Sequence, residues 1–144
     1  MKNILMTWQL WALLSALFAA FTAIFAKVGI EGINSDFATF IRTVVILFVL
    51  GIILSVTQQF QPIASLSQKS LLFLILSGLA TGGSWICYFR ALKIGNASQV
   101  APIDKLSVVF VAVLGLIFLN EHISLTHWIG IILIASGAMI IALK

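Results

Sequence analysis

Apolar residues fill this chain in long runs, and short polar segments separate one run from the next. A helix of about 20 apolar residues crosses the roughly 30 Å hydrocarbon core of a bilayer. On this scale the pattern predicts five spans, at residues 4–26, 37–56, 71–89, 98–119 and 125–143. The polar segments between the spans are residues 27–36, 57–70, 90–97 and 120–126. They are too short for a second domain, so we expect one domain over residues 1–144.

Helices explain the runs better than the strands of a membrane barrel. Barrel strands alternate polar and apolar residues over about ten positions, whereas residues 43–54 are apolar on every side. The expected fold class is therefore all-α, a polytopic membrane protein with five transmembrane helices. The first apolar run is longer than the core of a typical signal peptide, so we interpret it as an uncleaved first helix.

The composition agrees with a membrane protein and limits its partners. Hydrophobic residues make up 62% of the chain and charged residues 8%. We expect a multi-pass protein of the cytoplasmic (inner or plasma) membrane, with the lipid bilayer as its surroundings. The net charge is +4, but the basic residues form no cluster, so we expect anchors at helix ends and no nucleic acid partner. The single cysteine, Cys87, leaves no intramolecular disulfide and is expected to pack as a small apolar residue.

The basic residues also bear on orientation. An odd number of spans places the two chain ends on opposite sides of the membrane, and the positive-inside rule then favours an outer N-terminus and an inner C-terminus. The bias is weak, and insertion in both orientations stays open. Lys2 and Lys69 lie on one side, and Lys27, Arg42, Arg90, Lys93 and Lys144 on the other.

Asp104 and Lys105 are the charged residues set well inside an apolar run, just after Pro102. Each costs about 2.5–3.5 kcal/mol at the centre of a membrane helix, which favours a function for the pair. If the helix begins at Ser98, Asp104 lies roughly 9 Å along it, and consecutive helical residues diverge by about 100°, so at least one charge needs a partner elsewhere. In the alternative interpretation Pro102 opens the helix, Asp104 is a first-turn acid and Lys105 reaches toward the interface.

The third run supplies a second set of candidates. Gly78 and Gly82 have the spacing of a GxxxG motif, which predicts close helix packing within the subunit, at a dimer seam or at a hinge. Trp85 and Tyr88 share a helix face and are candidates for an apolar wall against an organic substrate, with core packing as the alternative.

Weaker candidates are hydroxyl groups and histidines. Ser15 and Thr22 share a side of the first helix and either line a route or bond to their own backbone, and Ser107 follows the charged pair. Capping or surface roles are favoured over metal binding for Glu121, His122 and His127, because no third ligand is apparent. We therefore expect no metal and no cofactor.

From Tyr88 onward the sequence has a set of features that occur together: Tyr88 itself, the Ala91-Leu92-Lys93 turn that leads to Ala97-Ser98, the apolar run that ends at Asn120-Glu121, and Gly130 with Gly137. With these features it resembles the closing half of an EamA domain of the drug/metabolite transporter superfamily. The first half fits more loosely, through Lys27 and Phe40-Ile41-Arg42.

The resemblance implies one five-helix repeat with a transport function. Much of the family has a proline where Val108 stands here, whereas Pro102-Ile103-Asp104-Lys105 looks like the five-helix bacterial and archaeal branch, so the kink near Val108 is expected to move toward Pro102. Larger members look like two inverted repeats, which implies that a single repeat pairs with an oppositely inserted copy. A parallel dimer, or pairing with a sister subunit, stays open. The small multidrug transporters carry a first-helix glutamate, and no acid lies in the first run here.

The function expected is secondary transport of a small metabolite or organic compound by alternating access, with proton coupling left open. Asp104 is the predicted ion-coupling or substrate-orienting group, Lys105 its counter-charge, and Trp85 with Tyr88 the apolar wall. An enzyme is not expected, since no nucleophile–base pair, HExxH motif or Walker motif occurs. The alternative is a non-transporting accessory subunit or a component of a lipid flippase.

Overall fold

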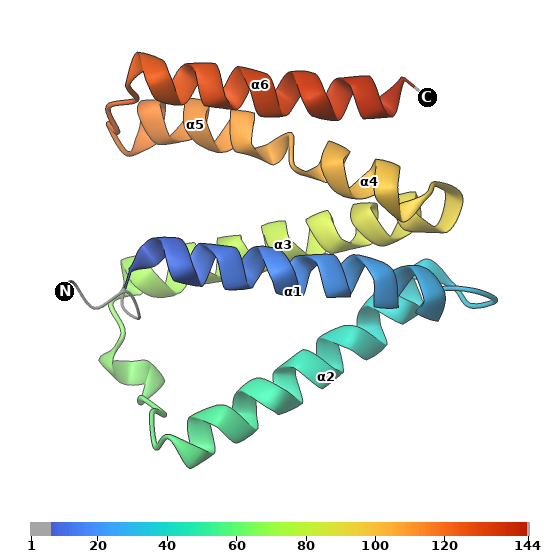
Figure 1. Ribbon diagram of the computed structural model, residues 1–144. Coiled ribbons are helices and arrows are strands. Elements are labelled where there is room, and N and C mark those ends of the chain that lie inside the picture. Colours follow the sequence, from blue (N-terminus) through green and yellow to red (C-terminus); the bar gives the residue numbers. More distant parts are fainter. Residues whose placement is uncertain (1–6, 144) are drawn as a thin grey trace. The chain divides into compact units, whose positions relative to one another are not determined.

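The computed structural model describes residues 7–143, and within this range the chain is helical without strands (Figure 1). α4 and α5 form one candidate span, so five segments of the described chain are long and apolar enough to cross a membrane. The prediction of an all-α protein with five transmembrane helices is confirmed. The elements are α1 (Trp8–Gly29), α2 (Ser35–Val56), the short 3-10 helix η2 (Ile63–Ser65), α3 (Gln68–Ile94), α4 (Ala97–Asp104), α5 (Ser107–Phe118) and α6 (Leu125–Ala142).

The helix boundaries differ most from the prediction in α3. This helix runs from Gln68 to Ile94, beyond the predicted residues 71–89, and so includes Arg90 and Lys93. Arginine, alanine, leucine and lysine all favour helix, and long basic side chains at a helix end reach the interface, so polarity does not stop the helix there. Residues 4–6 of the first predicted span, together with Lys2 and Lys144, lie outside the described residues.

Short polar side chains and left-handed residues set several helix ends. The Asn34 side chain accepts from the backbone N–H groups of Asp36 and Phe37 and begins α2. Ser124 caps α6 in the same way by accepting from the His127 N–H. α5 ends before Asn120, whose φ of 53° is left-handed, a conformation that asparagine adopts more readily than most residues.

The chain divides into two compact units. The central unit, Val28–Lys93, contains α2, η2 and nearly all of α3; the terminal unit consists of the residues up to Lys27 and those from Ile94 onward. In the terminal unit α6 packs along both α4 and α5 (Figure 1). There, too, Lys27 Nζ at the end of α1 donates to the Gly95 carbonyl at 2.8 Å. A single domain over residues 1–144 stays a prediction beside this division.

Most large apolar residues face outward, and small residues supply half of the buried apolar positions of the described chain, beside Ile30, Phe89 and Leu92. Ala112 of α5 and Ala138 of α6 are buried, whereas Phe48 and Leu133 are more than two-thirds exposed. In a bilayer, lipid covers such apolar side chains, and helices associate through small residues that let their backbones approach. The burial pattern is therefore that of a membrane protein rather than of a water-soluble bundle.

Candidate functional site

The fourth span is interrupted in its first half, immediately after Asp104. α4 ends at Asp104, Lys105 and Leu106 form a turn, and α5 begins at Ser107 (Figure 1). The N–H groups of Leu106, Val108 and Val109 donate to carbonyls three residues back, at 2.9–3.1 Å, instead of four back as in an α-helix. The span is thus a discontinuous helix, with the interruption about 10 Å from its start at Ala97.

Pro102 contributes to the interruption without opening the helix. It lies inside α4, and its ring nitrogen carries no hydrogen for the Ser98 carbonyl one turn earlier. The interpretation in which Pro102 is the first helical residue is therefore wrong, since α4 begins at Ala97. The kink expected near Pro102 is found at Lys105 and Leu106, slightly farther along the chain.

Asp104 and Lys105 contact each other at this interruption. Lys105 Nζ lies 3.3 Å from Asp104 Oδ2, with side-chain exposures of 60% and 36%. The expectation that consecutive residues cannot meet was wrong: Lys105 keeps helical dihedral angles and its N–H still bonds to the Ala101 carbonyl, but its long side chain reaches back to the Asp104 carboxylate. Ser107 is the exposed first residue of α5, so it follows the pair directly.

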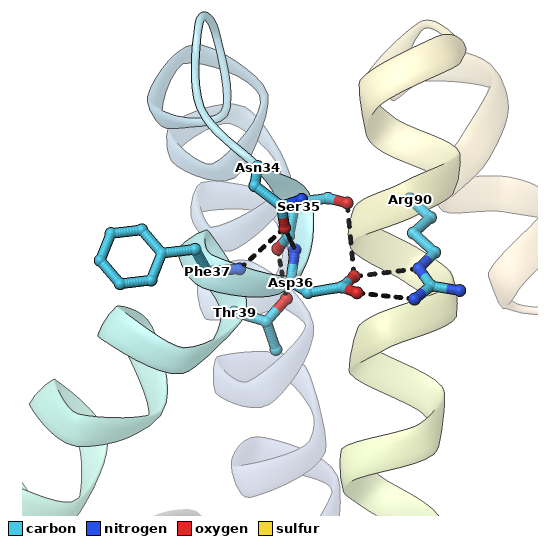
Figure 2. A network of polar contacts seen from close by, with 6 residues as sticks. All are labelled: Asn34, Ser35, Asp36, Phe37, Thr39 and Arg90. Carbon is cyan, nitrogen blue, oxygen red and sulfur yellow. Dashed lines mark hydrogen bonds and ion pairs between the residues drawn. The ribbon is translucent and has the colours of Figure 1, made fainter.

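The central unit holds a second acid–base pair, which joins two helices (Figure 2). Arg90 of α3 donates from Nε to Asp36 Oδ1 at 2.9 Å and from Nη2 to Asp36 Oδ2 at 2.6 Å. This two-point geometry is the strongest that an arginine and a carboxylate form. Lys93 Nζ donates to the Ile33 carbonyl at 2.6 Å, so the end of α3 is held to the start of α2 at two places.

A cleft of about 570 Å³ lies between α2 and α3, below the ion pair. Its threonine hydroxyls bond to their own helix: Thr39 Oγ1 donates to the Ser35 carbonyl, Thr43 Oγ1 to that of Thr39, and Thr81 Oγ1 to that of Ser77. With the proton engaged, each threonine oxygen is left as an acceptor. The lining residues are Asp36, Thr39, Phe40 and Thr43 of α2, with Leu74, Ser77, Gly78, Thr81, Gly82, Trp85 and Ile86 of α3.

Arg42 of α2 lies over aromatic rings of α3. Its guanidinium carbon is 4.3 Å from the centre of the Trp85 ring and 5.3 Å from that of Phe89. Both distances are within the range of cation–π attraction. Arg42 therefore joins the two helices at Trp85, which also lines the cleft.

The structure divides the predicted site residues between the two units. Asp104, Lys105, Ser107 and Pro102 meet at the interruption in the terminal unit, which also contains Ser15 and Thr22 on α1. In the central unit, Trp85, Gly78 and Gly82 line the cleft, whereas Tyr88 is not among the lining residues and packs edge-on against Phe89. The functional roles of all these residues stay predictions.

Sequence reasoning missed Asp36 and Arg90 and treated Arg42 as an anchor. The available signal was topological: the start of the second span and the end of the third lie on one side of the membrane, so their charges are within reach of each other. No group of three or more histidine, cysteine, aspartate or glutamate residues among residues 7–143 is arranged to hold a metal ion.

These features define a class: a multi-pass helical membrane protein with a discontinuous span and a charged pair at its interruption. A match to the EamA-like transporter family extends over residues 6–143, and the chain belongs to that family. The resemblance noted in the sequence is thereby confirmed, and the protein is an integral membrane transporter.

Individual relatives agree with this family. The chain is 58% identical over 136 residues to an uncharacterized transporter of a Sinorhizobium species, covering 94% of this chain and 96% of that protein. It is 32% identical over 135 residues to an uncharacterized protein of Methanocaldococcus jannaschii, covering 92% and 93%. An uncharacterized transporter of Bacillus subtilis is 29% identical over 130 residues, which cover 89% of this chain and 40% of that protein. No solved structure gives a significant match.

Proposed function

We propose that this transporter is a secondary carrier of small metabolites or organic compounds that works by alternating access in the cytoplasmic membrane. The observation that carries the proposal is the interrupted fourth span with Asp104 and Lys105 at the interruption. Backbone that leaves the helix is tolerated at membrane depth only where protein or a water-filled cavity surrounds it. Secondary transporters use such interruptions as ion and substrate sites.

The helix dipoles give the interruption a defined chemistry. The carbonyl end of α4 carries partial negative charge, and the ionised Asp104 carboxylate at that end adds to it. A cation is therefore attracted there, and Lys105 supplies one in this conformation. In the proposed cycle a proton, a metal cation or a substrate ammonium replaces Lys105 as the partner of Asp104 and releases the two half-helices to move.

A dimer completes the proposed carrier. The chain carries one five-span repeat, and its match covers 40% of the Bacillus subtilis transporter, which leaves room there for a second repeat. Two inverted repeats give the in-plane pseudo-symmetry that alternating access exploits. A second copy inserted in the opposite orientation supplies the same symmetry, and the weak bias of the basic residues is compatible with both insertions.

Side-specific labelling tests the opposite insertion. In a Cys87→Ser background, Glu121→Cys places a single thiol in the exposed hairpin between α5 and α6. A membrane-impermeant maleimide applied to intact cells is expected to label about half of the protein, and the rest only after lysis. Labelling from one side alone would contradict pairing between opposite copies of this chain.

Reconstitution tests the transport mechanism. The purified protein is placed alone in liposomes, and proton flux and metabolite uptake are followed under an imposed pH gradient with a panel of organic compounds. Asp104→Asn is expected to abolish substrate-dependent flux. Glu121→Gln removes a carboxylate from the exposed hairpin of the same unit and is expected to leave the flux unchanged.

The readouts separate the parts of the proposal. Substrate uptake that survives Asp104→Asn in a folded protein would remove Asp104 from the pathway. Uptake without accompanying proton movement would assign the coupling to another ion. If the protein alone carries no compound of the panel, the proposal of an autonomous carrier is overturned in favour of an accessory subunit.

A further inference from the structure

Arg42 differs from Arg90 and Lys93 of the central unit in having no acceptor among the described residues. It lies on α2 about 10 Å beyond Ser35, the first residue of that helix, and is half-buried. Arg90 donates to Asp36, and Lys93 donates to the Ile33 carbonyl. Among residues 7–143 Arg42 forms no hydrogen bond and no ion pair. A charge at this depth is costly, so we expect it to be stabilised by an interaction other than a hydrogen bond or ion pair within the chain.

The position of its guanidinium leaves the donors available. Arg42 stacks over Trp85 and Phe89, which favours the cation through the ring faces and restricts its motion. Aromatic rings satisfy no N–H hydrogen bond, so the five donors of the planar fork remain for an oxyanion. Held in this way, the side chain is pre-organised to accept a carboxylate or phosphate through two parallel bonds.

The neighbouring cleft is suited to the remainder of an organic molecule. Trp85 is shared between Arg42 and the cleft, and Thr39, one helical turn before Arg42, also lines it. Phe40, Leu74 and Ile86 give the cleft apolar walls. Its volume of about 570 Å³ is within the 300–1,000 Å³ range typical of small-molecule sites.

We propose that Arg42 binds the anionic oxygens of an organic anion whose apolar body lies in the α2–α3 cleft against Trp85. As a binding site the proposal stands on the central unit alone; as the substrate site it rests on the transport function proposed above. It adds a substrate class, organic anions with an apolar body, to a carrier whose coupling residue lies on another span.

Two sources supply an anionic oxygen group beside an apolar chain: a free metabolite and the phosphate of a membrane lipid. Both satisfy the Arg42 fork, and they differ in whether the anion diffuses in water or in the bilayer. The experiment therefore needs a soluble arm and a lipid arm. Phenylacetate serves as the soluble anion, phenylacetamide as its neutral isostere, and phosphatidylglycerol against phosphatidylcholine as the lipid comparison.

Trp85 provides a local reporter that does not depend on transport. Replacing Trp8, Trp11 and Trp128 by phenylalanine leaves Trp85 as the only indole of the chain. The protein in phosphatidylcholine nanodiscs is then titrated with phenylacetate, and a saturable change in the Trp85 emission is the measure of binding. The same titration is made in Arg42→Gln, in Arg42→Lys, and in Lys69→Gln, which removes an equal charge from an exposed position at the start of the facing helix, outside the cleft lining.

The expected result is saturable binding of phenylacetate and not of phenylacetamide. Arg42→Gln weakens it roughly tenfold or more, the scale of a lost bidentate charged contact. Arg42→Lys, which keeps the charge without the fork, weakens it less. Lys69→Gln binds as the parent protein does. The Arg42→Lys and Lys69→Gln titrations keep the test decisive if Arg42→Gln fails to fold.

Four outcomes overturn the proposal or restrict it. Equal responses to phenylacetate and phenylacetamide would overturn the anion site, as would equal binding in the parent protein and the Arg42 variants. A response to phosphatidylglycerol alone would assign the site to lipid and overturn the substrate class. Uptake that depends on Asp104 but not on Arg42 would leave the proposed carrier intact and overturn the role of the Arg42 site as its substrate site.

Discussion

The Asp36–Arg90 pair joins two helices, whereas the Asp104–Lys105 pair joins two consecutive residues at the point where a helix stops. The first has two short bonds between residues 54 positions apart, and the second has one contact of 3.3 Å between neighbours. Rotation of the Arg90 side chain out of the first pair breaks two bonds and removes a link between α2 and α3. The second dissociates by rotation of the Lys105 side chain alone.

The difference shows that the role of a charged pair depends on what its partners are attached to. Asp36 is also fixed by two neighbours: its backbone N–H donates to the Asn34 side chain, and Ser35 Oγ donates to the Asp36 carboxylate at 3.4 Å (Figure 2). Asp104 has the helix interruption beside it and a mobile cation as its partner. We therefore assign a holding role to the α2–α3 pair and an exchangeable role to the pair at the interruption.

Charge exchange within each pair is expected to give the largest contrast. Asp104→Lys combined with Lys105→Asp conserves both charges but moves the carboxylate off the end of α4, so we expect uptake to fall roughly 100-fold, as when a positioned proton carrier is removed. Asp36→Arg combined with Arg90→Asp is expected to recover much of the thermal stability that Arg90→Asp alone loses. Recovery is incomplete because Arg at position 36 opposes the dipole of α2.

The two readouts are uptake in liposomes and melting in detergent, with the amount of folded protein measured for each variant. Uptake near the parent level after the exchange at the interruption would contradict the assignment. So would a failure of the Asp36→Arg, Arg90→Asp double variant to melt higher than the single variant.

Closing the interruption tests whether the break itself matters. Pro102→Ala restores an N–H for the Ser98 carbonyl and removes the ring, which is expected to stabilise the fourth span by up to ~3 kcal/mol. Uptake is expected to fall even though Asp104 and Lys105 are retained. Circular dichroism, melting temperature and uptake are compared with those of Pro62→Ala, a control outside the spans. A more stable protein with unchanged uptake would show that the break is not part of the cycle.

Arginine-to-lysine changes are expected to have a smaller effect. Arg90→Lys keeps the charge but loses the two-point geometry with Asp36, so the melting temperature should fall by several degrees. Lys105→Arg alters one single contact and should leave the melting temperature unchanged. Equal shifts in the two variants, measured under the same detergent conditions, would contradict the distinction between a holding pair and an exchangeable pair.

Glycine-to-alanine changes are expected to have the smallest effect. A Cβ at Gly82 meets no atom within 4 Å, whereas one at Gly115 lies 3.0 Å from Glu121 Oε2. Gly82→Ala should therefore gain most of the ~1 kcal/mol by which alanine favours helix over glycine, and Gly115→Ala less, because the Glu121 side chain must shift. Melting temperatures report both. A loss of stability in Gly82→Ala would show that a neighbouring helix approaches this glycine closely, as its GxxxG spacing predicts.

The five spans could be predicted because the bilayer allows few alternatives. Every buried backbone group must bond within its own helix, so apolar length alone fixes the number of helices. Asp104 and Lys105 could be found for the same reason, since charges inside apolar runs are rare. The break at Lys105 and Leu106 could not be located from Pro102, because the position where the chain leaves the helix depends on which earlier carbonyls the N–H groups after Pro102 find.

The α2–α3 contacts could not be predicted because they join residues far apart in the sequence. Asp36 and Arg90 are each ordinary residues for a helix end, and only their meeting gives them a role. Arg42 has the same charge as an interfacial anchor, and the distinction lies in Trp85 and Phe89 on the facing helix. Local pattern thus predicts the elements, while the side-chain partners between helices require the structure.

Hydrogen exchange of the protein in nanodiscs tests the central claim, that the interruption in the fourth span opens to water while the α2–α3 end stays closed. Backbone amides of residues 104–109 are compared with those of residues 36–42, with and without Asp104→Asn. We predict faster exchange at the interruption in the parent protein, slowed by Asp104→Asn, and slow exchange in α2 in both proteins. Equal protection of the two segments, or an exchange rate at the interruption that Asp104→Asn leaves unchanged, would contradict the account.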